Sequence, residues 1–424
     1  MAVPARSRWH ALSLPVSLLL LLSLVSPAHA APAGARPAGI GTDTETVEEG
    51  EAEFDEIEAL KAKAAQEGDW GQSKEDEVKV NERIFTKTWN KAPFGSDAFD
   101  MTPEQIQANW GDIMRAIRVP YPSPEYLRTR SERFPVFKQS VPNFNGDYEE
   151  LSRNVINVWR LFFRGDFQEA EREGDKYGVA GMIPGKVSQM IYAVYLEPNL
   201  ADKHMLLQDV ANTVREYSTA VDQMKKEKQF QADYIILRVG YSYSIGRIAE
   251  DVPIPVAIGR NYVFKLLGAT NDILELDPDN PLGLAFRAGI DANVVRKVGK
   301  ATGRVTFGAK QTNVKSYFDR VLKDVPDWAI LRYEYANALL YMDKKRQIDE
   351  ALAQFQEASK ARPRIAMEAL DAMYAAKRRK EVEALSRWSG SFRSFERKRL
   401  KYQKDNNINL YCVLPKVCPA YIIQ

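Results

Sequence analysis

The hydrophobic positions from about residue 146 onward recur at helical spacing. In "YEELSRNVINVWRLFFR" one helical stripe is formed by Leu151, Val155, Val158, Trp159 and Phe162. Similar stripes occur in "KHMLLQDVANTVREYSTAVDQMKKE", in "ADYIILRVGYSYSIGRIAE" and in "VAIGRNYVFKLLGATNDILEL". No stretch shows the regular alternation of apolar and polar residues that is typical of a strand. The pattern therefore predicts an all-α chain, arranged as a bundle or as a solenoid.

Local motifs predict where two of these helices begin or end. In "LFFRGDFQEA", Gly165 separates the apolar face that ends at Phe162 from the face that begins at Phe167, which predicts a tight turn between two helices. Upstream, Thr102 precedes a proline and is followed three residues later by Gln105. This is the sequence of a capping box, so we expect a helix to begin directly after Thr102.

Three segments with a proline between two apolar helical stretches indicate internal repeats. Pro278, Pro326 and Pro363 are 48 and 37 residues apart. The tetratricopeptide repeat, a pair of helices, has a period of about 34 residues. We expect the extra residues to lie in "DKKRQ" and in "RKVGKATGRVTFGAK", and we interpret the second of these as a basic, glycine-containing linker. Alanines in "EYANAL" and "EALAQF" would let paired helices approach closely.

On these segments, residues 275–384 and 148–178 resemble tetratricopeptide (TPR) repeats. The stretch from "VRKVGK" to "EYANALL" is similar to the repeat domains of the regulators of microtubule dynamics and of the T-component of tripartite periplasmic (TRAP) transporters. The resemblance implies an α-solenoid of TPR-like helical hairpins with a flexible N-terminal extension. It implies a concave inner face that binds an extended peptide or, in some relatives, an apolar ligand.

The function that we expect is that of a non-catalytic exported scaffold or adaptor, which binds a protein or peptide partner in the cell envelope. Seven residues are candidates for partner binding on the inner face: Tyr234, Arg238, Tyr241, Tyr243, Arg247, Tyr333 and Tyr335. The alternative for such a stripe is ordinary packing. The T-component resemblance implies a second function, a ligand-binding accessory of a periplasmic solute-uptake system, which would require an apolar cavity within the helical stack.

The N-terminal region predicts export. Arg6 and Arg8 precede the apolar run "ALSLPVSLLLLLSLVSP", and "AHA" forms a small-residue cleavage site before Ala31. The sequence thus predicts a signal peptide over 1–30, no transmembrane anchor after its removal, and a periplasmic or secreted protein. The remaining expected segments are an acidic, partly disordered stretch (31–80), an N-terminal helical and extended segment packed on the repeats (81–145), the repeat domain (146–404) and a C-terminal tail (405–424).

Charge and cysteine content exclude several classes of protein. The chain has 59 Lys and Arg against 57 Asp and Glu. Loss of the two signal-peptide arginines brings the net charge near zero, which argues against a nucleic-acid partner. The only cysteines, Cys412 and Cys418, predict a local disulfide in an oxidising compartment. A two-thiolate metal site would lack further ligands, so no metal is expected.

The search for catalytic motifs predicts neither an enzyme nor a cofactor. "AGMIPGKVS" lacks the glycine and the hydroxyl residue of a phosphate-binding loop. One histidine, His204, remains after signal cleavage, and we expect it at a helix start, in a capping or surface position. An enzyme with a carboxylate or lysine site stays an alternative, which would require a buried, strongly perturbed acid or lysine in a cleft. The basic residues of 360–404 predict a solvated face or, alternatively, contact with an anionic surface.

Overall fold

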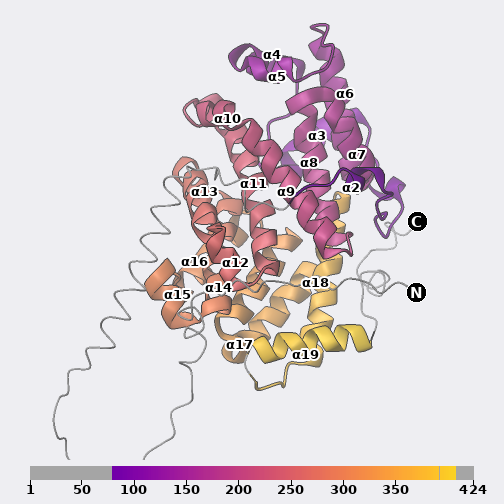
Figure 1. Ribbon diagram of the computed structural model, residues 1–424. Coiled ribbons are helices and arrows are strands. Elements are labelled where there is room, and N and C mark those ends of the chain that lie inside the picture. Colours follow the sequence, from indigo (N-terminus) through magenta and orange to yellow (C-terminus); the bar gives the residue numbers. More distant parts are fainter. Residues whose placement is uncertain (1–78, 391, 407–424) are drawn as a thin grey trace, which may run out of the picture. The chain divides into compact units, whose positions relative to one another are not determined.

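The computed structural model describes residues 79–390 and 392–406, which consist of helices joined by short loops (Figure 1). No strand occurs in these two ranges, so the predicted all-α class is confirmed for them. The predicted signal peptide, nearly all of the acidic segment, and Cys412 and Cys418 lie outside the described residues and stay predictions. None of the described helices combines the length and the apolarity that a bilayer crossing requires.

The first half of the described chain leads into a group of long helices. Its elements are α2 (Arg83–Thr86), η3 (Ser96–Phe99), α3 (Pro103–Ile113), α4 (Pro124–Arg133), α5 (Pro135–Gln139), α6 (Tyr148–Arg164), α7 (Phe167–Gly174), η4 (Asp175–Tyr177), α8 (Gly178–Tyr195), α9 (Leu200–Glu216), α10 (Ser218–Lys225), η5 (Lys228–Phe230) and α11 (Gln231–Asp251). The short N-terminal helices pack against this group, since α2 contacts α9, while α3 and α4 contact α6.

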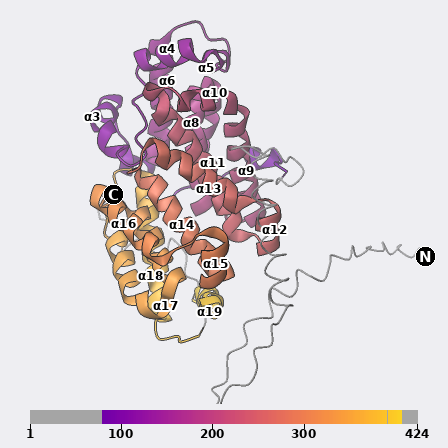
Figure 2. The ribbon, with the colours of Figure 1, turned by 90° about the vertical axis from the view of Figure 1, so that its left-hand side faces the viewer.

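The second half continues the array with α12 (Ile254–Gly259), α13 (Tyr262–Leu276), α14 (Pro281–Val298), α15 (Lys300–Phe307), α16 (Gln311–Asp324), α17 (Ala329–Ser359), α18 (Ala366–Ala384) and α19 (Phe392–Asp405). Neighbours in this order pack together, such as α13 with α14, and α17 with α18, and so do helices further apart in it, such as α14 with α16 and with α17. The helix α18 also contacts α6 and α8. The C-terminal helices therefore return to the first long helices, and Figure 2 shows the same array after a quarter turn.

The two local motifs form as predicted. The hydroxyl of Thr102 accepts a hydrogen bond from the amide of Gln105 at 3.3 Å, and the Gln105 side chain accepts one from the amide of Thr102 at 2.8 Å. This capping box begins α3. At the end of α6, Gly165 has a φ of 88°, and a Cβ there would lie 3.0 Å from the Cβ of Ala366 on α18. The turn thus requires glycine both for its conformation and for its close packing.

The three prolines lie between helices as predicted, the repeats themselves stay a prediction, and one linker differs from its prediction. Pro278, Pro326 and Pro363 lie in the loops before α14, α17 and α18. Within "DKKRQ", the non-helical backbone of Asp343 divides α17 into two helices, as the expected insertion requires. In contrast, the predicted basic linker forms the helix α15, because Gly299 and the glycine after Phe307 allow the chain to start and stop a separate helix between them.

Glycines bring α7 and α8 into backbone contact. A Cβ on Gly181 would lie 2.4 Å from the carbonyl oxygen of Gly174, and a Cβ on Gly174 would lie 2.6 Å from the carbonyl oxygen of Gly181. Both clashes are with main-chain atoms, which cannot rotate away as a flexible side chain would. The approach of these two helices therefore depends on the absence of side chains at both positions.

The substitution Gly181→Ala tests this contact. We expect it to lower the free energy of unfolding by about 2 kcal/mol or more, because the methyl group forces two packed helices apart. Gly240→Ala is the matched control: Gly240 is also buried within a long helix, α11, but a Cβ there meets nothing within 4 Å. It should be neutral or stabilise by up to about 1 kcal/mol. Urea unfolding measures both, and equal values would contradict the close contact.

Candidate ligand-binding site

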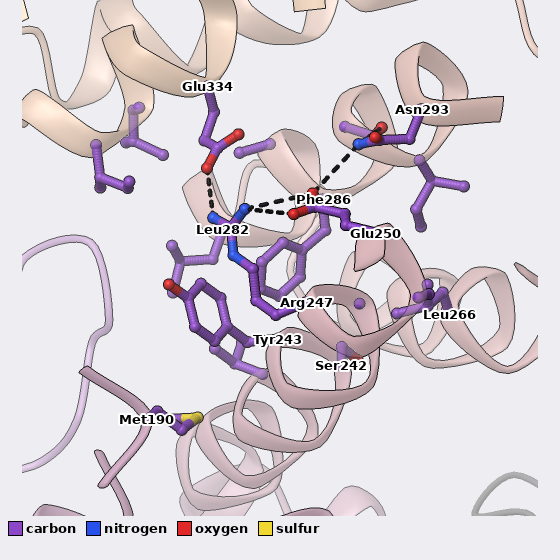
Figure 3. A pocket seen from close by; sticks show the side chains of 18 of the residues that line it. Met190, Ser242, Tyr243, Arg247, Glu250, Leu266, Leu282, Phe286, Asn293 and Glu334 are labelled. Carbon is purple, nitrogen blue, oxygen red and sulfur yellow. Dashed lines mark hydrogen bonds and ion pairs between the residues drawn. The ribbon is translucent and has the colours of Figure 1, made fainter. Parts of the chain in front are cut away.

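A cavity of about 250 Å³ lies among α8 and α11 of the first half of the array and α12 to α15, α17 and α18 of the second half. Aliphatic and aromatic side chains form most of its lining, among them Met190 of α8, Leu266 of α13, and Leu282 and Phe286 of α14 (Figure 3). The short helix α12 separates part of the cavity from solvent: Ile254 and Ile258 line the cavity, whereas Pro253, Pro255 and Gly259 are exposed. The cavity can therefore accept an apolar group.

Both long and short helices contribute to the lining. Lining residues come from α8, α11, α12, α13, α14, α15, the first part of α17 and α18. The helices α9 and α16 contribute none, and neither does the part of α17 that follows Asp343. We call the helices that contribute lining residues the inner helices.

Arg247 forms a charged centre at one side of the cavity, with Tyr243 and Phe286 beside it (Figure 3). Its Nη1 lies 3.0 Å from Oε2 of Glu250, one turn later on α11, and its Nη2 pairs with Oε1 of Glu334 on α17. The carboxylate of Glu250 also lies 3.5 Å from the side-chain nitrogen of Asn293 on α14. One guanidinium therefore links α11 to α17 and, through Glu250, to α14.

Asp371 of α18 is a second polar group in the lining, and it is 2% exposed. The hydroxyl of Tyr195 on α8 donates a hydrogen bond to its Oδ1. Burial raises the pKa of the Asp371 carboxyl to about 8, against the opposing effect of the Tyr195 hydrogen bond. Burial also raises the pKa of Tyr243 to about 12, while the neighbouring Arg247 acts in the opposite direction. At neutral pH Asp371 therefore holds its proton in most molecules.

Several buried polar atoms of the lining have no hydrogen-bond partner among the described residues. These atoms are Ser242 Oγ, Arg247 Nε, Asn293 Oδ1, Trp328 Nε1 and Asp371 Oδ2. A buried polar atom without a partner costs about 1–3 kcal/mol. A bound molecule that supplies a hydrogen-bonding group at this side of the cavity would remove part of that cost, so the lining can recognise a polar end as well as an apolar body.

Of the seven candidate residues from the sequence, the structure brings Tyr243 and Arg247 together at the cavity. Tyr234 and Arg238 are buried on another stripe of α11, where both hydrogen-bond to Asp272 of α13 at 3.0 and 2.8 Å. The remaining three, all in the interior, are Tyr241, half-buried Tyr333 beside Phe355, and Tyr335, which stacks on Phe318. The binding of a partner by these five residues stays a prediction.

Sequence reasoning missed the acidic residues and Tyr195 of the site. Glu250 follows Arg247 at a helical spacing of three, which is a detectable pairing signal. Asp371 stands in "MEALDAMYAA", where two carboxylates, those of Glu368 and Asp371, interrupt a segment of small apolar residues. That interruption could have marked a buried acid. Nothing in the sequence, however, predicts that Tyr195, separated from Asp371 by 176 residues, hydrogen-bonds to it.

The other predicted features lie away from the cavity. His204, in the first turns of α9, is half-buried, and its Nε2 lies 3.1 Å from Asp251 at the end of α11. In the basic C-terminal helices, Arg378 and Arg399 are engaged in ion pairs with Glu396 and Glu381 at 3.0 and 2.5 Å. No group of three potential metal ligands occurs within residues 79–390 and 392–406.

Comparisons with known proteins assign no family to the chain. No family model matches it, and no curated protein or solved structure is similar to it. Membership of the TPR family therefore stays a prediction from the sequence, and the function has to be inferred from the cavity and its lining.

The titration of Asp371 should be visible in the pH dependence of stability. Its folded pKa lies above that of an unfolded aspartate, so the folded protein keeps a proton that the unfolded chain loses near pH 4. The stabilisation is complete below about pH 4 and is lost as the pH rises to about 8. Besides Tyr195, the charged groups that act on Asp371 are Glu368, Glu334 and Arg247.

We expect Asp371→Asn to remove this dependence, because an amide resembles the protonated acid and does not titrate. Between about pH 5 and 8 the unfolding free energy of the natural protein should fall relative to that of the variant by up to about 1.4 kcal/mol per pH unit. Asp291→Asn is the control, since burial raises the pKa of Asp291 only to about 6. The difference in unfolding free energy between the natural protein and Asp291→Asn should therefore become constant above about pH 6. A constant difference between the natural protein and Asp371→Asn over this range, in urea unfolding, would contradict the burial of an acidic carboxyl.

Proposed function

We propose that this protein binds a small molecule with an apolar body in the cavity between its inner helices. The observation that carries the proposal is an apolar cavity of about 250 Å³ whose lining includes buried, unpartnered polar atoms. Protein interiors are normally packed without such spaces. An apolar cavity of about 150 Å³ already accommodates benzene, so this cavity has room for a larger group.

The proposed binding is driven by the removal of apolar surface from water. Each buried methylene group contributes about 0.8 kcal/mol, or about fourfold in affinity. The polar atoms near Arg247 and Asp371 orient the ligand, because its polar end is accommodated there at a lower cost than against the aliphatic lining of α13 and α14.

The proposal agrees with the alternative implied by the T-component resemblance, a ligand-binding accessory of a periplasmic solute-uptake system. It is supported by the apolar lining that several helices contribute, because this resemblance requires an apolar cavity within the helical stack. We retain export, the periplasmic location and the solenoid as parts of the proposal that rest on the sequence.

The scaffold function is the second candidate, and the exposed basic residues of α19 favour it. Arg397, Lys398, Lys401 and Lys404 are exposed on this helix, and Leu400 beside them is 55% exposed. Such a face suits contact with an acidic protein or an anionic surface. The enzyme alternative would depend on Asp371, the buried acid of the cavity, and stays a prediction.

A neutral probe tests the proposed cavity. We expect octan-1-ol to bind to the full-length chain in isothermal titration calorimetry, and each methylene removed from the probe to weaken binding by about fourfold. Gly289→Leu should reduce octanol affinity by at least about tenfold. Gly289 lines the cavity and a Cβ there meets nothing within 4 Å, so the leucine side chain enters the space that the probe needs.

Gly268→Leu is the matched control. Gly268 lies within α13, a Cβ there also meets nothing within 4 Å, and the residue is not part of the lining. This variant should bind octanol as the natural protein does. Absence of octanol binding by the natural protein, or equal binding by both leucine variants, would contradict the proposal.

A further inference from the structure

The charge balance of the lining restricts the polar end of the ligand. The charged residues that line the cavity are the bases Arg247 and Lys297 and the acids Glu250, Glu334 and Asp371. The ammonium of Lys297 lies 3.0 Å from the main-chain carbonyl oxygen of Val252 at the end of α11. Three acids therefore face two bases. While Asp371 is protonated the charges of the lining balance, and ionisation of Asp371 leaves the lining with one net negative charge, which a bound cation would neutralise.

The guanidinium of Arg247 is a poor receptor for an anionic group. Both of its terminal nitrogens are engaged by carboxylates, one by Glu250 at 3.0 Å and the other by Glu334. An incoming carboxylate or phosphate would have to bind through Nε alone or displace one of these partners, which would leave that carboxylate without its counterion.

The carboxyl group of Asp371, in contrast, suits a cationic group. One of its oxygens accepts the hydrogen bond from Tyr195, and the other has no partner among the described residues although the side chain is 2% exposed. A bound ammonium group favours the ionised form of the carboxyl, so that Asp371 releases its proton to solvent when the amine binds. The free oxygen then accepts a hydrogen bond from the ammonium, which supplies both a donor and a positive charge.

We propose that the ligand of this cavity is a cationic amphiphile, with an aliphatic or aromatic body among the apolar residues of α13 and α14 and a protonated amine that hydrogen-bonds to Asp371. This inference rests on the proposed function and names the class of ligand. The carboxylates of Glu334 and Glu250 favour the cation further. Both pair with the single guanidinium of Arg247, so one negative charge of this group is left over.

Three probes of equal chain length separate this inference from the proposed function. Octylamine, octan-1-ol and octanoate each contain eight carbons and differ in the polar end, which near neutral pH is a cation, a neutral hydroxyl and an anion. Calorimetry on the full-length chain gives their dissociation constants. We expect octylamine to bind at least about tenfold more tightly than octanol, and octanoate to bind more weakly than octanol.

Octanol binding with no preference for the amine, or a preference for octanoate, would overturn the cationic ligand and leave the proposed function intact. Failure of all three probes to bind would overturn both. A carboxylate preference would indicate instead that Arg247 exchanges one of its partners for the ligand.

Asp371→Asn tests the role of the carboxyl directly. It should weaken octylamine binding by at least about tenfold and change octanol binding by less than about threefold, because the amide keeps the shape of the protonated acid but cannot ionise to pair with the ammonium. Asp291→Asn is the control: Asp291 is a buried acid of α14 with a raised pKa, but it does not line the cavity. Equal loss of amine binding in both variants, or none in either, would overturn the role of Asp371. The comparison of the three probes on the natural protein remains decisive if Asp371→Asn does not fold.

Discussion

The cost of burying charged groups is the constraint on which the inner helices depend. Arg247 and Asp371 lie on different helices in an otherwise apolar interior, and neither can be buried without a partner. Arg247 forms an ion pair with Glu334 on α17, and Asp371 accepts a hydrogen bond from Tyr195 on α8. These contacts hold α11 near α17 and α8 near α18, and each joins segments that are far apart in the chain. The space between these helices is bounded by apolar side chains that do not fill it, so the polar contacts and the cavity belong to one arrangement.

This arrangement explains why a small ligand suits the protein better than an extended peptide does at this position. A peptide presents main-chain donors and acceptors along its whole length, which an aliphatic lining cannot satisfy. An amphiphile presents polar atoms at one end only, and the polar residues of the lining gather around Arg247 and Asp371. The basic face of α19 lies on a different part of the protein and is suited to another kind of partner. The cavity and the basic face of α19 therefore suit different kinds of molecule.

Much of the helical organisation could be predicted from the sequence, because it depends on local chemistry. The capping box at Thr102, the glycine turn at Gly165 and the prolines between repeats are decided by residues close together in the chain. The prediction of a basic linker was wrong, because residues 300–307 form a helix, which the two flanking glycines allow. The site could be predicted only in part. Tyr243 and Arg247 lie on the side of α11 that lines the cavity, whereas Tyr234 and Arg238 hydrogen-bond to Asp272. The pairing of Tyr195 with Asp371 depends on the return of α18 to α8, which no local pattern encodes.

The central claim is that the inner helices line an apolar cavity which a ligand can enter without rearrangement of the helices. A crystal structure of the protein under xenon pressure tests this claim most directly, because xenon enters apolar cavities and scatters strongly. We predict xenon between α11 and α14, next to Phe286 and Gly289, with the Arg247–Glu334 pair unchanged. Side chains of α13 and α14 that fill this space, with no xenon among them, would contradict the claim.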